Sequence, residues 1–312
     1  MQFIFCADPF DIRQPDFDYV TEYEAVKSLG YQPAFIDFEA LVNDQNAEKA
    51  VRKVSIQPTE QVGLYRGWML TPAQYQQLFE ALTKRGIRLL NDATAYKHCH
   101  YLPESYSIIA PYTPKSVWLT LNGELDIDAI MSLLHDFGDR PIILKDFVKS
   151  RKHEWHEACY IPQASDKTTV ERVVHRFLQL QETGLNEGLV FREFVDFEPL
   201  TTHPKSGMPL TQEFRLFFLD GELIYVSKYW DEGNYAETDP PITQFCEVAQ
   251  IVQSRFFTMD VAKQLNGDWM IVELGDGQVA GLPDSADVTA FYQSLLAHQL
   301  SSDVSSLPAQ DT

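Results

Sequence analysis

The chain has 312 residues, 45% of them hydrophobic and 22% charged, so it is long enough to bury a large core in two or three packed units. Its formal net charge of −20 argues against general affinity for nucleic-acid backbone or anionic membrane, because the summed field repels both. No apolar run approaches the ~20 residues of a transmembrane helix, and the N-terminus lacks a signal-type pattern. The four cysteines are scattered without disulfide-framework spacing, so we expect a cytoplasmic protein with free thiols.

The first hundred residues alternate short apolar runs with helical patterns. Strands are expected at residues 3–6, 33–36 and 62–65, and helices at 19–29 and 72–85. This alternation is typical of a small parallel α/β sheet. No GxGxxG motif follows the first strand, so a dinucleotide site is not indicated.

A second unit begins near Leu102 and mixes strands with amphipathic helices. The expected strands are residues 116–121, 141–147, 158–161 and 189–195, and the expected helices are 126–137 and 168–181. The polar run 149–156 is expected to form a loop between the second and third of these strands.

The C-terminal third contains two hairpins. The first spans residues 213–228 and turns at Asp220-Gly221, and the second spans 256–277 and turns at Asn266-Gly267. Helices are expected at residues 242–254 and 285–299. The small, polar tail 301–312 is expected to be disordered.

The register of the second hairpin brings two carboxylates together. A two-residue turn at Asn266-Gly267 places Val261 opposite Val272 and Asp260 opposite Glu273. Facing like charges destabilise a sheet unless a proton is shared or a cation lies between them. The sequence therefore predicts a divalent-metal site, with an exposed acidic ladder as the alternative.

The same register argument applied to the first hairpin pairs Arg215 with Val226 and Glu213 with Lys228. These pairings would place Glu213, Arg215 and Lys228 on one face of the sheet. Glu213 and Lys228 alone could form a cross-strand ion pair, worth only ~0.2–1 kcal/mol. The addition of Arg215 favours a binding surface.

Cationic side chains precede the acidic hairpin along the chain. They are Lys115, Lys145, Lys149, Arg151, Lys152, Arg215 and Lys228. A polyphosphate nucleotide needs cations on its oxygens together with carboxylates that hold a bridging Mg²⁺. Lys145 is the most informative cation, because it ends the apolar run 142–144, where a lysine needs an anionic partner or a route to solvent.

Motifs in this order resemble the ATP-grasp superfamily, and most closely its small clade named for two arginines and a lysine. The resembling segments are Pro141-Ile-Ile-Leu-Lys-Asp-Phe-Val-Lys-Ser, Leu189-Val-Phe-Arg-Glu-Phe-Val, Glu213-Phe-Arg, Val226-Ser-Lys and Asp260 with Val272-Glu273. The resemblance implies a Rossmann-like α/β unit at residues 1–100, followed by an ATP-grasp fold of two α+β subdomains at 101–300. The lid subdomain would span about 101–190 and the metal-binding subdomain about 191–300.

The resemblance also implies nucleotide-binding roles for individual residues. Lys115 and Lys145 match the lysines directed at ATP phosphates. Residues 149–153, which include Lys149 and Ser150, match the mobile loop that closes over them, although this loop lacks the usual glycines. Glu193, Phe194 and Val195 match the hinge that meets the adenine edge, and Glu198 is placed to accept from ribose hydroxyls.

The catalytic and metal-binding roles fall on the two hairpins. Arg215 matches the arginine that stabilises the transferring phosphoryl group, with Lys228 beside it. Asp260 and Glu273 match the metal-binding acids. The family often has Asn two residues after this Glu, but this chain has Gly275, so the third ligand is assigned to Asp276.

The implied activity is that of an ATP- and Mg²⁺-dependent ligase. It would activate a carboxylate as an acyl-phosphate, which an amine or similar nucleophile then attacks, with small-molecule or peptide substrates. The alternatives are an ATP-dependent phosphotransferase and a non-catalytic ATP-binding module.

The tripeptide Arg66-Gly67-Trp68 follows the third expected strand, where it would contact an acceptor substrate or form a turn around a packed Trp. The substrates and the oligomeric state are not encoded in recognisable motifs.

Overall fold

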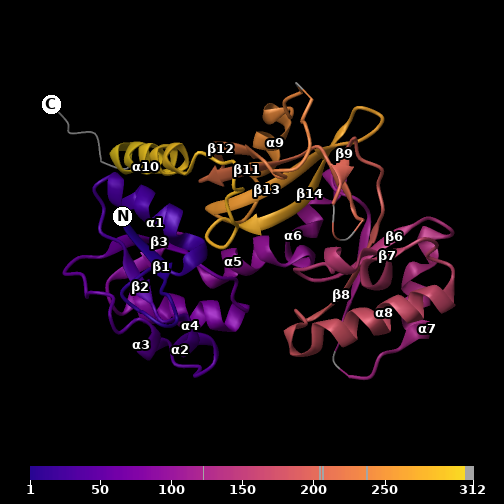
Figure 1. The fold of residues 1–312 in the computed structure, drawn as a ribbon, viewed down its shortest axis with the longest axis horizontal. Coiled ribbons are helices and arrows are strands. Elements are labelled where there is room, and N and C mark those ends of the chain that lie inside the picture. Colours follow the sequence, from indigo (N-terminus) through magenta and orange to yellow (C-terminus); the bar gives the residue numbers. More distant parts are fainter. Residues whose placement is uncertain (122, 204, 206, 237, 306–312) are drawn as a thin grey trace.

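The computed structural model describes residues 1–305 apart from 122, 204, 206 and 237. Three four-stranded sheets, one parallel and two antiparallel, form three successive units along the chain (Figure 1). The mixed α/β architecture agrees with the expected fold class. In this described part, no helix combines the length and hydropathy needed to cross a membrane.

The N-terminal unit is a parallel sheet of order β2-β1-β3-β4, as expected. Its strands are β1 (Gln2–Cys6), β2 (Ala34–Ile36), β3 (Gln61–Arg66) and β4 (Ile87–Leu89), and its helices are α1 (Val20–Ser28), α2 (Phe38–Val42), α3 (Ala47–Ala50), α4 (Pro72–Thr83) and α5 (Ala93–His100). Helix α4 begins at a capping box of Thr71 and Gln74, with Pro72 at its first position. Strand β4 and helix α5 were not anticipated from the sequence.

The second unit is an antiparallel sheet of order β5-β8-β6-β7. Its elements are α6 (Leu102–Ile109), β5 (Ser116–Thr120), α7 (Ile127–Leu134), β6 (Ile142–Asp146), β7 (Tyr160–Ile161), α8 (Lys167–Gln181) and β8 (Gly188–Glu193). Helices α7 and α8 bury Leu134, Val174 and Phe177 against Leu144 and Leu189 of the sheet. The expected loop 149–156 is partly helical, because a 3₁₀ turn covers Lys152–Glu154 and a π-helical turn covers Trp155–Cys159.

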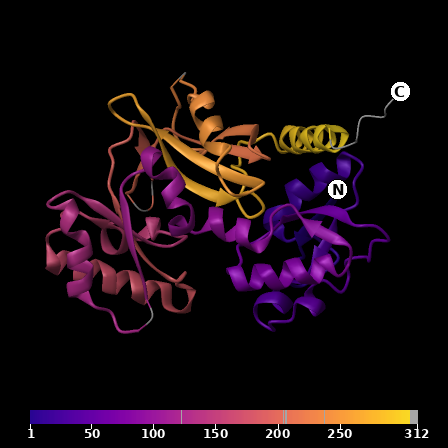
Figure 2. The same cartoon turned by 180° about the vertical axis from the view of Figure 1, so that it is seen from behind.

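The third unit is an antiparallel sheet of order β12-β11-β13-β14. Its elements are the short pair β9 (Pro199–Thr202) and β10 (Pro209–Thr211), β11 (Glu213–Leu219), β12 (Glu222–Lys228), α9 (Ile242–Ala249), β13 (Phe256–Lys263), β14 (Trp269–Asp276) and α10 (Val288–Ser305). Helix α10 returns to the N-terminal unit and lies beside α1 (Figures 1 and 2). Helix α10 includes residues 301–305, so the expectation of a disordered tail is wrong for these residues. The reason is that adding a turn to an existing helix costs little free energy. The remainder of the expected tail lies outside the described residues.

The pairing of Asp260 with Glu273 is confirmed, but the register between these residues and the turn differs from the expectation. Val261 pairs with Ile271 instead of Val272, and a bulge then leaves Val272 unpaired and restores the expected register at Asp260. The strand register is thus one residue off next to the turn, and the bulge shifts it back by one residue before the acidic pair.

In the first hairpin a bulge shifts the register by one residue and no second shift restores it. The expected pairings of Arg215 with Val226 and of Glu213 with Lys228 are therefore wrong. Strands β11 and β12 start in register at Leu219 and Glu222, but the register shifts beyond Phe218. Lys228 therefore pairs with Phe214, and Ser227 pairs with Arg215. Because paired residues share a face of the sheet, Lys228 lies on the opposite face from Glu213 and Arg215.

Arg66 joins the N-terminal unit to the third unit. Its buried guanidinium donates to both Glu22 oxygens at 2.7 and 2.9 Å, and to the carbonyl oxygens of Gly277 and Ala280 at 2.6 and 2.9 Å. Tyr292 of α10 donates to the same Glu22 at 2.5 Å. Arg66 is therefore fully engaged in fixing the turn after β14 and does not point at an acceptor substrate.

Candidate active site

Two adjoining cavities lie between the second and third sheets. The polar cavity has a volume of about 380 Å³, and its charged lining includes Lys145, Lys149, Arg215, Asp260 and Glu273. The hinge cavity, of about 360 Å³, is lined by residues of the chain segment that leaves β8 and by apolar side chains that include Trp155, Met208 and Trp230. Ile143, Lys152, Arg192 and Val272 line both cavities, so the two adjoin at these residues. The bulged residue Val272 thus lies at their junction.

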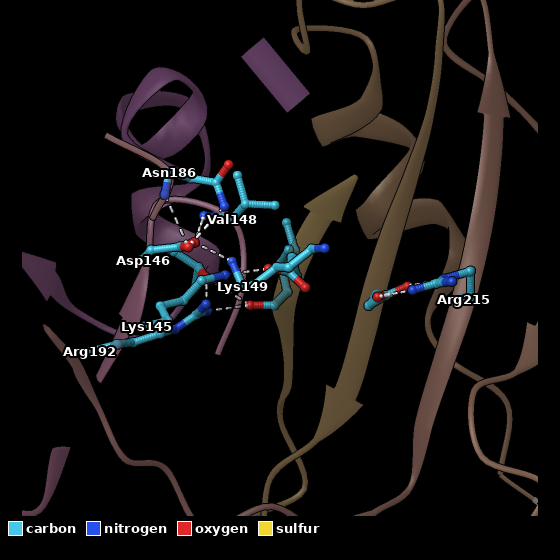
Figure 3. Close-up of polar contacts among 11 residues, drawn as sticks. Lys145, Asp146, Val148, Lys149, Asn186, Arg192 and Arg215 are labelled. Atoms are coloured by element: carbon cyan, nitrogen blue, oxygen red, sulfur yellow. Dashed lines mark hydrogen bonds and ion pairs between the residues drawn. The ribbon is translucent and has the colours of Figure 1, made fainter. Parts of the chain in front are cut away.

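The facing acids of β13 and β14 each contact a cation from another strand. Arg215 of β11 donates to both oxygens of Asp260, from Nε at 2.8 Å and from Nη2 at 2.7 Å. Lys145 of β6 forms an ion pair with Glu273 and is itself only 5% exposed. Figure 3 shows Lys145 and Arg215 reaching the strand pair from two different sides. The polar cavity therefore combines two carboxylates with two cations in a largely buried setting.

Asp146 fixes the turn that carries Lys149 and Ser150. Its buried carboxylate accepts from the backbone N–H groups of Val148 and Lys149 and from the side chain of Asn186 at 2.8 Å (Figure 3). Lys145 and Ser150 form an isolated bridge across the same turn. Lys149 and Ser150, both predicted to bind nucleotide, are thereby placed in the wall of the polar cavity without the help of glycines.

The three predicted hinge residues, Glu193, Phe194 and Val195, all line the hinge cavity. Phe194 packs edge-on against Tyr160, with ring centroids 5.2 Å apart. Glu193 forms an ion pair with Arg140. The chain here supplies backbone groups and apolar side chains to one cavity, which suits the edge and face of a flat aromatic base.

Three predicted site residues lie outside both cavities. Lys115 is 40% exposed and contacts Asp136 at 3.2 Å. Glu198 contacts Lys263 at 3.1 Å. Lys228 is exposed on the opposite face of the sheet, where its ammonium lies 5.2 Å from the centroid of the Tyr235 ring. The structure therefore does not place Lys228 beside Arg215 as predicted, because of the bulge in β12.

Asp276 borders the polar cavity but does not join the acidic pair. It pairs with Phe257 on the other face of the sheet from Asp260 and Glu273, and its carboxylate accepts from Asn91 and from the backbone of Gln278. Among the described residues, no three Asp, Glu, His or Cys side chains gather as a metal-binding group. Strand alternation thus turns Asp276 away from the other two acids, and its role as third ligand stays a prediction.

Burial raises the pKa of Asp276 to about 6, against a usual value of 3.8. Between about pH 4 and pH 6 the folded protein therefore holds a proton that the unfolded chain has lost, so stability falls as the pH rises through this window. We expect Asp276→Asn to remove this dependence. Across the window the variant should gain about 3 kcal/mol on the wild type, at 1.36 kcal/mol for each pKa unit. Urea unfolding of both proteins at pH 4 and pH 7 measures this, and equal pH slopes would contradict it.

Two site residues had no role assigned from the sequence. Arg192 is 4% exposed, lines both cavities and donates to Thr113 Oγ1 at 2.5 Å, and burial lowers its pKa to about 10. Glu213, also 4% exposed, lines the hinge cavity, and burial raises its pKa to about 7. For Arg192, the available signal was an arginine directly after the apolar run 189–191 of an expected strand. Glu213 had a signal too, because it shares a face with Arg215.

The donor set of the polar cavity fits Mg²⁺. This ion prefers hard oxygen ligands and is commonly held by one or two carboxylates together with phosphate oxygens of a substrate. Asp260 and Glu273 are paired across neighbouring strands and both line the polar cavity. Lysine and arginine side chains in the same cavity suit the phosphate oxygens. The fold and this site together define a nucleotide-binding protein of the ATP-grasp class.

A family model for the ATP-grasp domain matches residues 134–295, which is more than half of the chain. It describes family 3 of the ATP-grasp clade named for two arginines and a lysine. The protein belongs to this ATP-grasp family. No curated protein sequence matches it significantly.

Solved structures of ATP-dependent ligases share the fold. D-cycloserine synthetase DcsG aligns with a TM-score of 0.59 at 13% identity, covering 96% of this chain and 99% of that chain. The D-alanine–D-alanine ligase from Bacillus anthracis, complexed with ATP, aligns with a TM-score of 0.56 at 12% identity, covering 98% of both chains. The ATP-grasp ligase PsnB, complexed with a precursor variant, Mg and ADP, has a TM-score of 0.55 at 13% identity, covering 95% of this chain and 98% of that chain. Two of these solved ligases hold a nucleotide, ATP in one and ADP together with Mg in the other.

Proposed function

We propose that the protein is an ATP- and Mg²⁺-dependent ligase that joins a carboxylate to an amine through an acyl-phosphate. The observation that carries the proposal is the facing pair of Asp260 and Glu273 beside Lys145 and Arg215, at the junction of a polar and an apolar cavity. The substrates are proposed to be small-molecule or peptide acids and amines, as in the ligases that share the fold.

The two cavities divide the nucleotide between them. The hinge cavity takes adenine, with Glu193, Phe194 and Val195 along its edge. The polar cavity takes the phosphates, with Lys145, Lys149 and Ser150 in its wall and Arg192 at the junction. Lys115 and Glu198 contact the nucleotide only after their ion pairs with Asp136 and Lys263 break.

In the proposed reaction a carboxylate oxygen of the substrate forms a bond to the γ-phosphorus of ATP, and the bond to the β,γ-bridging oxygen breaks, leaving ADP. The amine then attacks the acyl carbon and phosphate departs, so one ATP yields one amide, ADP and phosphate. Arg215 is proposed to hold the transferring phosphoryl group, and Lys145 to orient the phosphates before transfer. Mg²⁺ held by Asp260 and Glu273 would neutralise charge on the β- and γ-phosphate oxygens.

Residues 1–100 are proposed to form a pre-ATP-grasp domain that contributes one wall of the acceptor space. Met69 and His100 from this unit line the polar cavity, together with Val279, Ala280 and Gly281 of the turn that Arg66 holds. Because burial lowers the pKa of His100 to about 4, its imidazole is neutral at physiological pH.

We place the boundary between the two ATP-grasp subdomains after Glu193, where β8 ends, because that strand lies entirely in the second sheet.

An assay of ATP consumption tests the proposal. Purified protein with MgATP is screened against acids and amines, singly and in pairs, and both ADP and free phosphate are measured. A ligase releases phosphate only when an acid and a nucleophile are both present. A phosphorylated final product without free phosphate would show a phosphotransferase, and MgATP binding without turnover on any pair would favour a binding module.

A further inference from the structure

Cations of the chain itself already engage both carboxylates of the proposed metal site. The fork of Arg215 takes both oxygens of Asp260, at 2.8 and 2.7 Å, and Lys145 is paired with Glu273. The side chains of Arg215 and Asp260 are 15% and 4% exposed, so water screens this pair weakly, whereas Lys145 is 6% exposed and its partner Glu273 is 36% exposed, so the second pair is screened more. The two ion pairs explain why two acids can face each other across neighbouring strands.

Arg215 and a divalent cation compete for Asp260. The bidentate guanidinium neutralises the carboxylate and uses one lone pair of each oxygen, and a cation bound to the same oxygens at about 2.1 Å would lie close to its positive charge, where repulsion in a buried site is strong. Metal coordination is therefore favoured when Arg215 releases Asp260. A buried arginine that loses its carboxylate is an unpaired buried charge, which strongly destabilises the protein unless another anion replaces the carboxylate.

The guanidinium of Arg215 has further contacts that would keep it in the cavity while it turns. Its Nη1 donates to the carbonyl oxygen of Gly281 at 2.8 Å, and its central carbon lies 4.7 Å from the centroid of the Tyr229 ring. A cation held at these contacts needs only to exchange one anion for another. The phosphate oxygens of a triphosphate in the polar cavity would supply that second anion.

We propose that Arg215 and Lys145 form a cation latch on the metal ligands, defined by their pairs with Asp260 and Glu273. The latch holds the two acids until a triphosphate takes over the two cations, which frees the acids to coordinate Mg²⁺. The latch rests on the function proposed above, because that function assigns the acids to the metal and the cations to the phosphates.

Charge balance makes the metal and the triphosphate bind as a unit. The latched state and the fully exchanged state both leave Asp260, Glu273, Arg215 and Lys145 each with an oppositely charged partner. Metal without triphosphate would leave two cations unpaired, and triphosphate without metal would leave two acids unpaired. The latch thus predicts weak binding of either component alone and strong positive coupling between them.

The direct test is metal affinity in the absence of nucleotide, with Mn²⁺ alone as the probe and its free concentration measured by electron paramagnetic resonance. Arg215→Gln removes one half of the latch and is expected to tighten Mn²⁺ binding at least tenfold. Arg255→Gln is the matched control, because it removes another bidentate arginine–aspartate pair, at 2.7 and 2.9 Å from Asp220, in the segments that flank strands of the same sheet. This control should bind Mn²⁺ as the wild type does.

A second change locates the gained site. Adding Asp260→Asn to Arg215→Gln should abolish the gain, and a gain that persists in the double variant would place the metal elsewhere and overturn the latch. Lys145→Gln provides an independent variant with the same expected direction, and circular dichroism checks that each protein is folded. Unchanged Mn²⁺ affinity in both folded single variants would also overturn the latch. Failure of the wild type to bind MgATP would instead overturn the proposed function.

Discussion

Arg215→Ala is expected to lower turnover by about 10³-fold or more while changing the affinity for MgATP little. The size follows from the loss of an arginine that stabilises a transferring phosphoryl group. The effect on affinity stays small because the substitution removes a ground-state contact with the phosphates together with the competing contact between Arg215 and Asp260, and these two changes offset each other. Turnover is measured as ADP formation with the acid and amine identified by the screen, and affinity by calorimetry.

Two further variants separate catalysis from folding in this experiment. Arg215→Lys keeps the charge but cannot reproduce a two-pronged contact with the transferring phosphoryl group, so we expect it to remain strongly impaired. Arg255→Ala removes the corresponding pair with Asp220, whose residues line neither cavity, and should leave both turnover and affinity near wild type. An equal loss of turnover and MgATP affinity in Arg215→Ala would show that Arg215 only supports the structure.

The central pair of the site could be predicted from the sequence partly through compensating errors. The Asn266-Gly267 turn signal and the alternation of side chains gave the right partners at Asp260 and Glu273. The register closer to the turn was off by one residue, and the bulge at Val272 restored it. Bulges depend on how a strand packs against its neighbours, and turn chemistry alone does not encode them. The uncompensated bulge in β12 removed Lys228 from the site for the same reason.

Contacts between distant segments account for the other differences. Lys145 was recognisable because an ammonium at the end of an apolar strand needs a partner, but Glu273 as that partner is 128 positions away. Asp276 was chosen for its spacing from Glu273, and only the fold shows that Asn91 of the N-terminal unit takes its carboxylate. Arg66 likewise follows a strand where ligands often bind, yet the turn after β14 occupies it. Local patterns give elements and faces, whereas such partners depend on tertiary packing.

Asp260→Asn is expected to abolish the Mg²⁺-dependent part of the stabilisation that ATP gives to the folded protein. The substitution keeps the shape of the side chain but removes the charge that a hard divalent cation requires. A ligand at one hundred times its dissociation constant stabilises the folded state by about 2.7 kcal/mol, which a thermal-shift measurement detects as several degrees. The experiment compares ATP with and without Mg²⁺ in the wild type and in the variant.

The thermal shift in this experiment must be read against each protein's own baseline. Asp260→Asn leaves the largely buried Arg215 without its carboxylate, so the variant should melt lower even without ligand. Asp268→Asn, at the exposed turn of the same hairpin, is the matched control and should keep the full shift. A lower baseline combined with a full Mg²⁺-dependent shift in Asp260→Asn would mean that Asp260 only anchors Arg215. The metal assignment would then have to be withdrawn, because Mg²⁺ would stabilise the complex without the charge of its proposed ligand Asp260.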